Sequence, residues 1–86
     1  MTDQMILQRL NEIFIDIFDD DSIVLTPATN SNDIDNWDSF NQINVIVAAE
    51  MRFGMKFNTA EIDALKNVGE MVSLIRRHAN AGAAHA

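Results

Sequence analysis

The chain contains no cysteine, one proline and three glycines among 86 residues. The absence of cysteine excludes disulfides and thiolate metal sites, and it leaves the polypeptide without a thiol nucleophile of its own. The scarcity of proline and glycine argues against a turn-rich β architecture. Apolar residues nevertheless make up 48% of the sequence, which suits one hydrophobic core at this length. We therefore predict a single all-α domain.

Basic residues and long apolar runs are also scarce. Six Lys and Arg face thirteen Asp and Glu, for a net charge of −7, which disfavours nucleic acid and anionic membrane surfaces and favours cationic partner surfaces. No run approaches the roughly 18 apolar residues of a membrane span, and the first residues lack the pattern of a secretory signal. We expect a cytoplasmic monomer that binds neither nucleic acid nor membrane.

Two long helices are predicted in the first two thirds of the chain. Over residues 5–18, apolar side chains repeat at intervals of three and four, and Thr2 stands where a capping oxygen is needed. A similar pattern covers residues 39–53, with Asp38 as the N-cap and Gly54 as the C-terminal stop. The apolar stripe of this second helix consists of Phe40, Ile43, Val47 and Met51, with Ile46, Ala49 and Phe53 alongside.

Residues 19–37 break the helical pattern and are rich in Asp, Asn, Ser and Thr. Loops of this length are uncommon in compact domains and usually have a role. We expect Ile23, Val24 and Leu25 to pin the loop onto the core. Asn36 can enter positive φ cheaply, which suits a turn, and Trp37 is predicted to anchor the loop.

Two further helix starts share one signature. Asn58 precedes Glu61, and Asn67 precedes Glu70, at the spacing of a capping box. The predicted helices span residues 59–65 and 68–78. The second of them presents an inward face of Val68, Met71, Val72 and Ile75, and its last turn holds Arg76, Arg77 and His78, whose charge suits the negative end of a helix dipole. Methionines 51, 55 and 71 are predicted to fill gaps in the core.

The order of a long helix, long loop, long helix, short helix and long helix, with Asp38-Ser39-Phe40 opening the second long helix, resembles the acyl carrier protein family. That family includes polyketide, peptidyl and aminoacyl carriers. The resemblance covers about residues 5–78. It implies an acyl-carrier-protein-like four-helix bundle, with residues 1–78 as the carrier domain, and a protein that is not itself an enzyme. Residues 79–86 are rich in Ala and Gly and lack an amphipathic pattern, so we expect a flexible C-terminal tail there.

The resemblance also implies that Ser39 receives 4′-phosphopantetheine from coenzyme A as a phosphodiester, and that the thiol of this arm carries acyl groups as thioesters. A phosphate at this position would lie near the free N–H groups of a helix start. The implied partners are a phosphopantetheinyl transferase, a loading enzyme and acyl-processing enzymes. Asp38 would mark the serine for the transferase, and Phe40, which replaces the commoner Leu, would also contact partners.

One departure from the family pattern concerns the charge of the second helix. Familiar fatty-acid carriers are rich in acids there, whereas this chain offers Asn41, Gln42 and Asn44, and its only acid after Ser39 is Glu50. The acids gather on the loop side instead, at Asp16, Asp19, Asp20, Asp21, Asp33, Asp35 and Asp38. We interpret this as a sign of a specialised, polyketide-like pathway.

Other functions compete with this interpretation. A peptidyl or aminoacyl carrier is the nearest alternative, and a cofactor-free acidic interaction module, docking through an exposed Phe40 or Met55, is a more distant one. Calcium binding is disfavoured because the fifth position of either acidic loop is Ile23 or Trp37, where an EF-hand needs a polar ligand. His78 and His85 lack partners at ligand spacing, so we expect no metal site.

Overall fold

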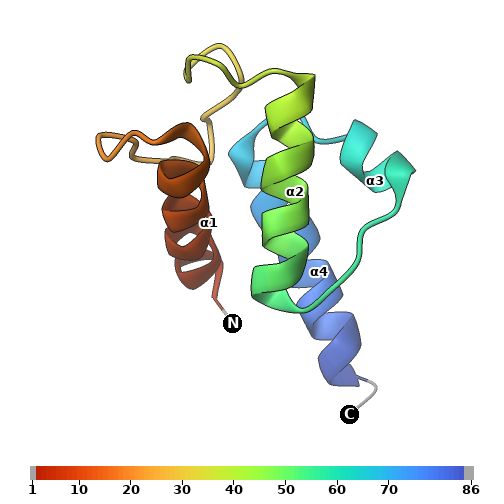
Figure 1. The fold of residues 1–86 in the computed structure, drawn as a ribbon. Coiled ribbons are helices and arrows are strands. Elements are labelled where there is room, and N and C mark those ends of the chain that lie inside the picture. The colour runs from red at the N-terminus through yellow and green to blue at the C-terminus, as the bar shows by residue number, and fades with distance from the viewer. Residues whose placement is uncertain (1, 85–86) are drawn as a thin grey trace.

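The computed structural model describes the backbone of residues 2–84 and the side-chain environments of residues 2–79. Four helices follow one another along the chain: α1 (Asp3–Phe18), α2 (Ser39–Phe53), α3 (Thr59–Asp63) and α4 (Val68–Ala84) (Figure 1). Residues 2–84 contain no strand. The prediction of an all-α four-helix fold with a long first loop and a short third helix is therefore confirmed. No helix in this part of the chain is long and apolar enough to cross a membrane.

Capping side chains mark the starts of the two long N-terminal helices, and α1 begins at Asp3, two residues before its predicted start. The Thr2 hydroxyl accepts a hydrogen bond from the Met5 N–H at 3.2 Å, and α1 ends at Phe18, with Asp19 as a left-handed C-cap at φ 50°. For α2 the predicted bounds are confirmed, with Asp38 as the N-cap and Gly54 as a left-handed C-cap at φ 65°. Glycine suits that position because it lacks the Cβ that makes positive φ costly.

The start of α3 confirms the predicted capping box, since Asn58 and Glu61 exchange side-chain and backbone hydrogen bonds. The helix ends at Asp63, two residues before the predicted end. At the start of α4 the Asn67 side chain accepts from the Glu70 N–H at 2.9 Å. Backbone carbonyls of the long loop provide further hydrogen-bond acceptors for the first N–H groups of α4.

Loop carbonyls complete the cap of α4. The N–H groups of Val68 and Gly69 donate to the carbonyls of Thr29 and Pro27, each at 2.8 Å. A Cβ on Gly69 would lie 2.8 Å from that same Pro27 oxygen, so only glycine permits this approach. The long loop is thereby fastened to the helix that lies farthest from it in sequence.

The C-terminal helix extends beyond its predicted end at residue 78. It continues to Ala84, because alanine has the highest helix propensity and a single Gly82 costs only about 1 kcal/mol. The prediction that Arg76, Arg77 and His78 serve the end of the helix dipole is therefore wrong, because none of them lies in the last turn of α4. Arg76 forms an ion pair with Asp3, and His78 Nε2 lies 2.9 Å from Glu61 Oε2. The predicted tail includes residues 85 and 86, which lie outside the described residues, and a domain boundary at residue 78 stays a prediction.

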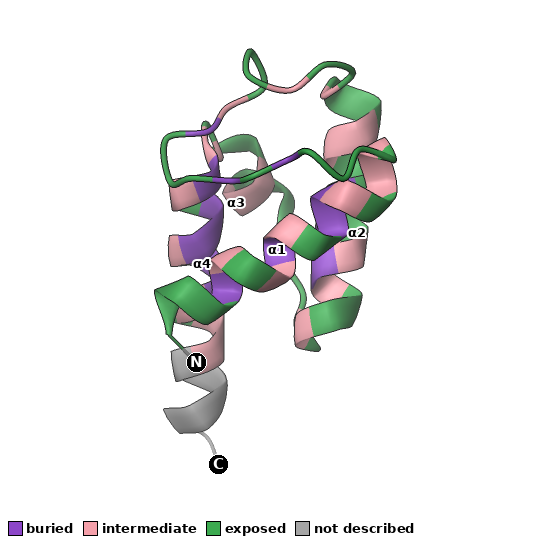
Figure 2. Cartoon of the chain, turned by 90° about the vertical axis from the view of Figure 1, so that its left-hand side faces the viewer, coloured by how far each residue is buried: buried purple, intermediate pink, exposed green. Residues whose placement is uncertain are grey.

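The core lies between α1, α2 and α4, whose buried residues face one another (Figure 2). It consists of Ile6, Leu10, Ile13, Phe14, Ile23, Leu25, Val45, Ile46, Ala49, Phe57, Val68, Met71, Val72, Leu74 and Ile75. The predicted inward face of α4 is confirmed by this set. Removing these apolar side chains from water is the main force that favours the folded state.

The long loop is pinned to the core by two of the three predicted residues. Ile23 and Leu25 are buried, but Val24 is 81% exposed, so its predicted core role is wrong. Extended backbone sends alternate side chains to opposite sides, which explains the difference. Asn11 of α1 fixes this stretch, because its amide donates to the Ile23 carbonyl at 3.1 Å and accepts from the Leu25 N–H at 2.7 Å.

The methionines predicted to fill the core differ in their surroundings. Met71 is 1% exposed, which confirms the prediction for α4, and Met55 is partly buried against the core. Met51 is 81% exposed, so the prediction for α2 is wrong. The helix turns its other face, with Val45 and Ile46, toward α1 and α4.

Candidate functional site

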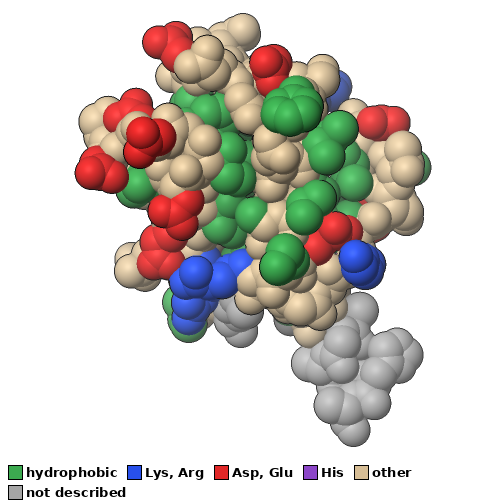
Figure 3. All heavy atoms as spheres, viewed as in Figure 1, with side chains coloured by type: hydrophobic (Ala, Val, Ile, Leu, Met, Phe, Trp, Pro, Cys, Tyr) green, Lys and Arg blue, Asp and Glu red, His purple; other side chains and the backbone are tan. Residues whose placement is uncertain are grey.

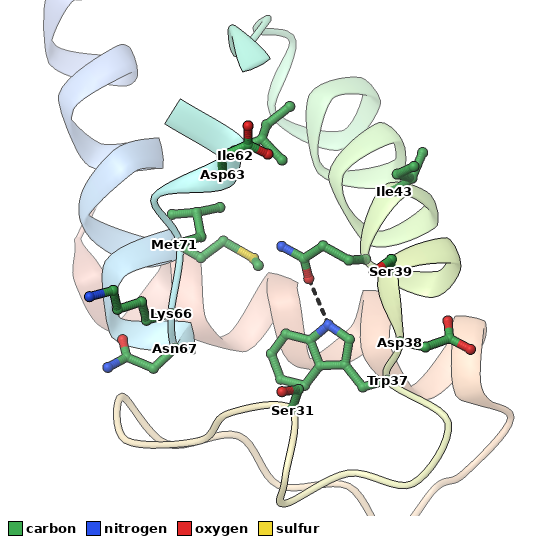
Figure 4. Close-up of a pocket in the computed structure, with 12 residues that line it drawn as sticks. Ser31, Trp37, Asp38, Ser39, Ile43, Ile62, Asp63, Lys66, Asn67 and Met71 are labelled. Atoms are coloured by element: carbon green, nitrogen blue, oxygen red, sulfur yellow. Dashed lines mark hydrogen bonds between the residues drawn. The ribbon is translucent and has the colours of Figure 1, made fainter. Parts of the chain in front are cut away.

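Ser39 is the first residue of α2, and it is exposed. The preceding residue performs the capping, since Asp38 is extended and its Oδ1 accepts from the Asn41 N–H at 2.9 Å. The Ser39 hydroxyl forms no hydrogen bond to another described residue. Ser39 therefore presents an uncommitted hydroxyl at a helix start, beside a groove (Figure 4).

The backbone turn that leads into Ser39 is held by α2 itself. Asn36 has a φ of 69°, as predicted from its tolerance of the left-handed region. The side-chain amide of Asn41 donates to the Asn36 carbonyl at 2.7 Å, and the Asp38 N–H donates to the same oxygen at 3.0 Å. Asn41 thus fastens the end of the loop to the first turn of α2, which positions Ser39.

Trp37 anchors the loop, as predicted. Its ring meets Phe14 of α1 edge to face, with centroids 5.0 Å apart, and its Nε1 donates to Gln42 Oε1 at 2.6 Å. The amides of Asn41 and Gln42 therefore connect α2 to the loop. In the sequence, these two residues stood out only because they replace the acidic residues of familiar fatty-acid carriers. The contact of Gln42 with Trp37 had one signal in the sequence: an amide side chain follows a tryptophan by five residues at a helix start.

A groove of about 570 Å³ adjoins Ser39. It lies between the start of α2, α3 and the loop, with Ser39 and Trp37 on one side and Ile62, Lys66 and Met71 on the other (Figure 4). Its lining consists of Ser31, Trp37, Asp38, Ser39, Gln42, Ile43, Ile62, Asp63, Leu65, Lys66, Asn67 and Met71. The groove was not predicted from the sequence, because its walls come from segments far apart in the chain.

Phe40 and Asp38, the two predicted partner contacts, flank Ser39 in sequence and are both exposed. The Phe40 side chain is 73% exposed and belongs to the face of α2 that points away from the core. Asp38 also lines the groove. Both side chains are placed where a protein that approaches Ser39 would meet them.

Glu50, the only acid of α2 after Ser39, forms a hydrogen bond with the backbone of the segment that follows α2. Its Oε2 accepts from the Phe57 N–H at 2.9 Å, which ties the connection between α2 and α3 to α2. Arg52 does not pair with Glu50 but with Glu12 of α1, at 2.7 Å. The outward surface of α2 therefore has little negative charge beyond Asp38.

Two carboxylates outside the groove have pKa values below their ordinary range. The hydroxyl and N–H of Ser22 lower the pKa of Asp20, and the Asn58 N–H, followed by His78, lowers the pKa of Glu61. Glu61 thereby links α3 to α4. Within the described residues no three His, Cys, Asp or Glu side chains are grouped to hold a metal ion. His85 lies outside the described residues.

Comparison with known proteins supports an assignment. No family model matches the chain. The acyl carrier protein of Lactobacillus acidophilus is 32% identical over 79 residues, which cover 91% of this chain and 98% of that protein. The solution NMR structure of holo acyl carrier protein from Geobacter metallireducens superposes with a TM-score of 0.85 at 44% identity, covering 93% of this chain and 92% of that one. The chain therefore belongs to the acyl carrier protein family, whose members are carriers rather than enzymes.

Proposed function

We propose that the chain carries acyl intermediates on a 4′-phosphopantetheine arm attached to Ser39. The observation that supports this best is the exposed, uncommitted hydroxyl at the first residue of α2, where Asp38 already provides the cap. When bound, the arm supplies the thiol that holds an acyl group as a thioester. The arm must supply this thiol because the chain itself has no cysteine.

The residues around Ser39 fit such a group. The first N–H groups of a helix have no intrahelical acceptor, and the N-terminal end of α2 has partial positive charge, so a phosphodiester on Ser39 would be stabilised there. The groove beside Ser39 offers apolar side chains of Ile43, Ile62 and Met71 for the rest of the arm or for its load. Exposure of Ser39 leaves it accessible to a modifying enzyme.

In the loading step the Ser39 Oγ bonds to the phosphorus that bears the pantetheine of coenzyme A. The pyrophosphate P–O bond breaks, adenosine 3′,5′-bisphosphate leaves, and the hydroxyl proton passes to a base of the phosphopantetheinyl transferase. The chain contributes the nucleophilic oxygen and its positioning through Asp38 and Asn41. Tethering then raises the effective concentration of the load at a docked enzyme.

We propose further that the protein serves a specialised, polyketide-like pathway, with a loading enzyme and acyl-processing enzymes as partners. The surface of α2 supports this, because it lacks the acids that would meet the basic patches of fatty-acid enzymes. Asn41 and Gln42 are tied to the loop, and Glu50 is engaged by Phe57. The two relatives are both acyl carrier proteins, which favours an acyl load over an aminoacyl one.

Intact-mass spectrometry tests the proposal. The wild-type chain, incubated with coenzyme A and a phosphopantetheinyl transferase, is expected to gain the mass of one arm, and Ser39→Ala is expected to gain none. Ser31→Ala is a matched control, because Ser31 is also exposed and lines the same groove, and it should load like the wild type. Absence of any gain on the wild type would contradict the proposal.

A further inference from the structure

Lys66 lines the same groove as Ser39. It belongs to the connection between α3 and α4, and Figure 4 shows it on the wall opposite Ser39. Lys66 is exposed and forms no ion pair within residues 2–79. Its ammonium group points away from the groove in this view, but no carboxylate of these residues holds it there. The flexible four-carbon stem of a lysine can therefore turn the group over the groove.

Few side chains of this protein can take up an acyl group in a stable form. The chain has no cysteine and no tyrosine, and its side-chain amines are Lys56 and Lys66. A serine hydroxyl is a weak nucleophile without an adjacent base, and the imidazole of His78 is paired with Glu61. An amide on a lysine is therefore the lasting acyl product that these side chains allow.

The two lysines differ in their distance from Ser39. Because α2 has 15 residues, it is about 22 Å long. Lys56 follows the far end of this helix and lines a cavity with Val47 and Met51. In Figure 3 most Lys and Arg side chains lie at the lower edge, away from the start of α2 at the top. Lys66 is thus the lysine that shares the Ser39 groove.

We propose that Lys66 accepts the acyl group from the arm on Ser39 of the same chain, in a slow transfer from sulfur to nitrogen that yields an Nε-acyl lysine. The inference rests on the proposed function. In this step the neutral amine of Lys66 bonds to the carbonyl carbon of the thioester, the C–S bond breaks, and the thiolate leaves. The thiolate takes up the proton that the nitrogen loses. The arm stays on Ser39 with a free thiol, so it can be loaded again.

Tethering makes the transfer selective for Lys66. An arm fixed at Ser39 keeps its thioester near the groove at an effective concentration on the order of 1 mM, far above that of loaded chains in dilute solution. Ile43, Ile62 and Met71 give the groove apolar surface, which favours an acyl chain there over one in water. The product has no charge on Lys66, and its acyl group is fixed to the wall of the groove.

Hydroxylamine distinguishes the two products, because it cleaves thioesters and leaves amides intact. The transferase attaches the arm together with its load when butyryl-coenzyme A replaces coenzyme A. After incubation at mildly alkaline pH and hydroxylamine treatment, tandem mass spectrometry of the wild type is expected to find butyryl on Lys66 at about ten times its level on Lys56. Lys66→Arg keeps the charge but cannot form the amide, so it should lose this signal. Lys56→Arg is the matched control and should keep it.

An isotope-labelled Ser39→Ala chain shows whether the transfer occurs within one chain. It has Lys66 but no arm, and in an equal mixture with the loaded wild type, freed of butyryl-coenzyme A, it should gain about ten times less butyryl than the wild type. Equal modification of the two chains would overturn the inference, as would equal modification of Lys56 and Lys66 or complete release of butyryl by hydroxylamine. These results leave the proposed function intact. If the wild type takes up no arm, the proposed function fails, and the inference fails with it.

Discussion

The two faces of α2 are both apolar, yet only one belongs to the core. Val45 is fully buried and Val47, two residues later, is 48% exposed. The inner face, with Ile46 and Ala49, is buried in the core, whereas the outer face, with Phe40, Ile43, Val47 and Met51, is exposed to solvent. The inner face provides the buried residues of α2. The comparison teaches that apolar periodicity identifies a helix without showing which side is buried, and that a surplus apolar face needs a functional explanation.

The strongest test of this comparison is one substitution made on each face. Val45→Asn would bury an amide without a partner and is expected to lower the free energy of unfolding by about 3 kcal/mol. Val47→Asn leaves the amide in water and should cost less than about 1 kcal/mol. Urea denaturation followed by circular dichroism measures both. Equal losses at the two positions would contradict the assignment of the faces.

A smaller effect is expected at the start of α2, where the helix follows the long loop. Asp38→Ala removes the N-cap of α2 and should lower the free energy of unfolding by about 1 kcal/mol. Asp35→Ala, at an exposed loop position, is the control and should change it by less than about 0.5 kcal/mol. Thermal unfolding of the two variants provides the measurement. If Asp38→Ala were as mild as Asp35→Ala, the stabilising role assigned to the Asp38 cap would be contradicted.

In contrast to α2, helix α3 has no buried residue, and polar contacts of Glu61 help to hold it. The folded-state pKa of Glu61 lies below its ordinary value of 4.5, owing to the Asn58 N–H and His78. Its contribution to stability is therefore present above pH 4.5 and is lost as the pH falls through the folded-state pKa. Glu61→Gln should reduce the loss of stability on acidification, as denaturant titrations between neutral and acidic pH would show. An identical pH profile in the variant would refute this role.

The smallest effect is expected at the edge between α1 and α2. Arg52 and Glu12 form an ion pair whose side chains are 42% and 49% exposed, and exposed pairs are worth about 0.5 kcal/mol or less. Arg52→Ala should therefore barely change the urea midpoint, and the difference should vanish in high salt. A loss above about 1 kcal/mol would show that α2 depends on this pair as well as on its inner face.

Features with local causes were predictable from the sequence. The bounds of α2 follow from Asp38 and Gly54, the positive φ of Asn36 from its residue type, and the start of α3 from the Asn58 and Glu61 pair. Each depends on residues within a few positions of one another. The candidate serine could likewise be singled out, because its place at a helix start is a local property.

Features that depend on tertiary contacts were not predictable. Met51 and Val24 are apolar, and nothing local shows that both are exposed. Arg76 and His78 pair with α1 and α3 rather than serving a helix end. The groove beside Ser39 is lined by residues of the loop, α2, α3 and α4 and of the connection between α3 and α4, which lie far apart in the sequence.

The identity of the modified residue is the most direct test of the proposed carrier role. After loading with coenzyme A and a phosphopantetheinyl transferase, proteolysis and tandem mass spectrometry should locate the whole arm on Ser39, within the peptide that also contains Trp37 and Phe40. An arm found on another side chain, such as Ser31 in the same groove, would contradict this role for Ser39.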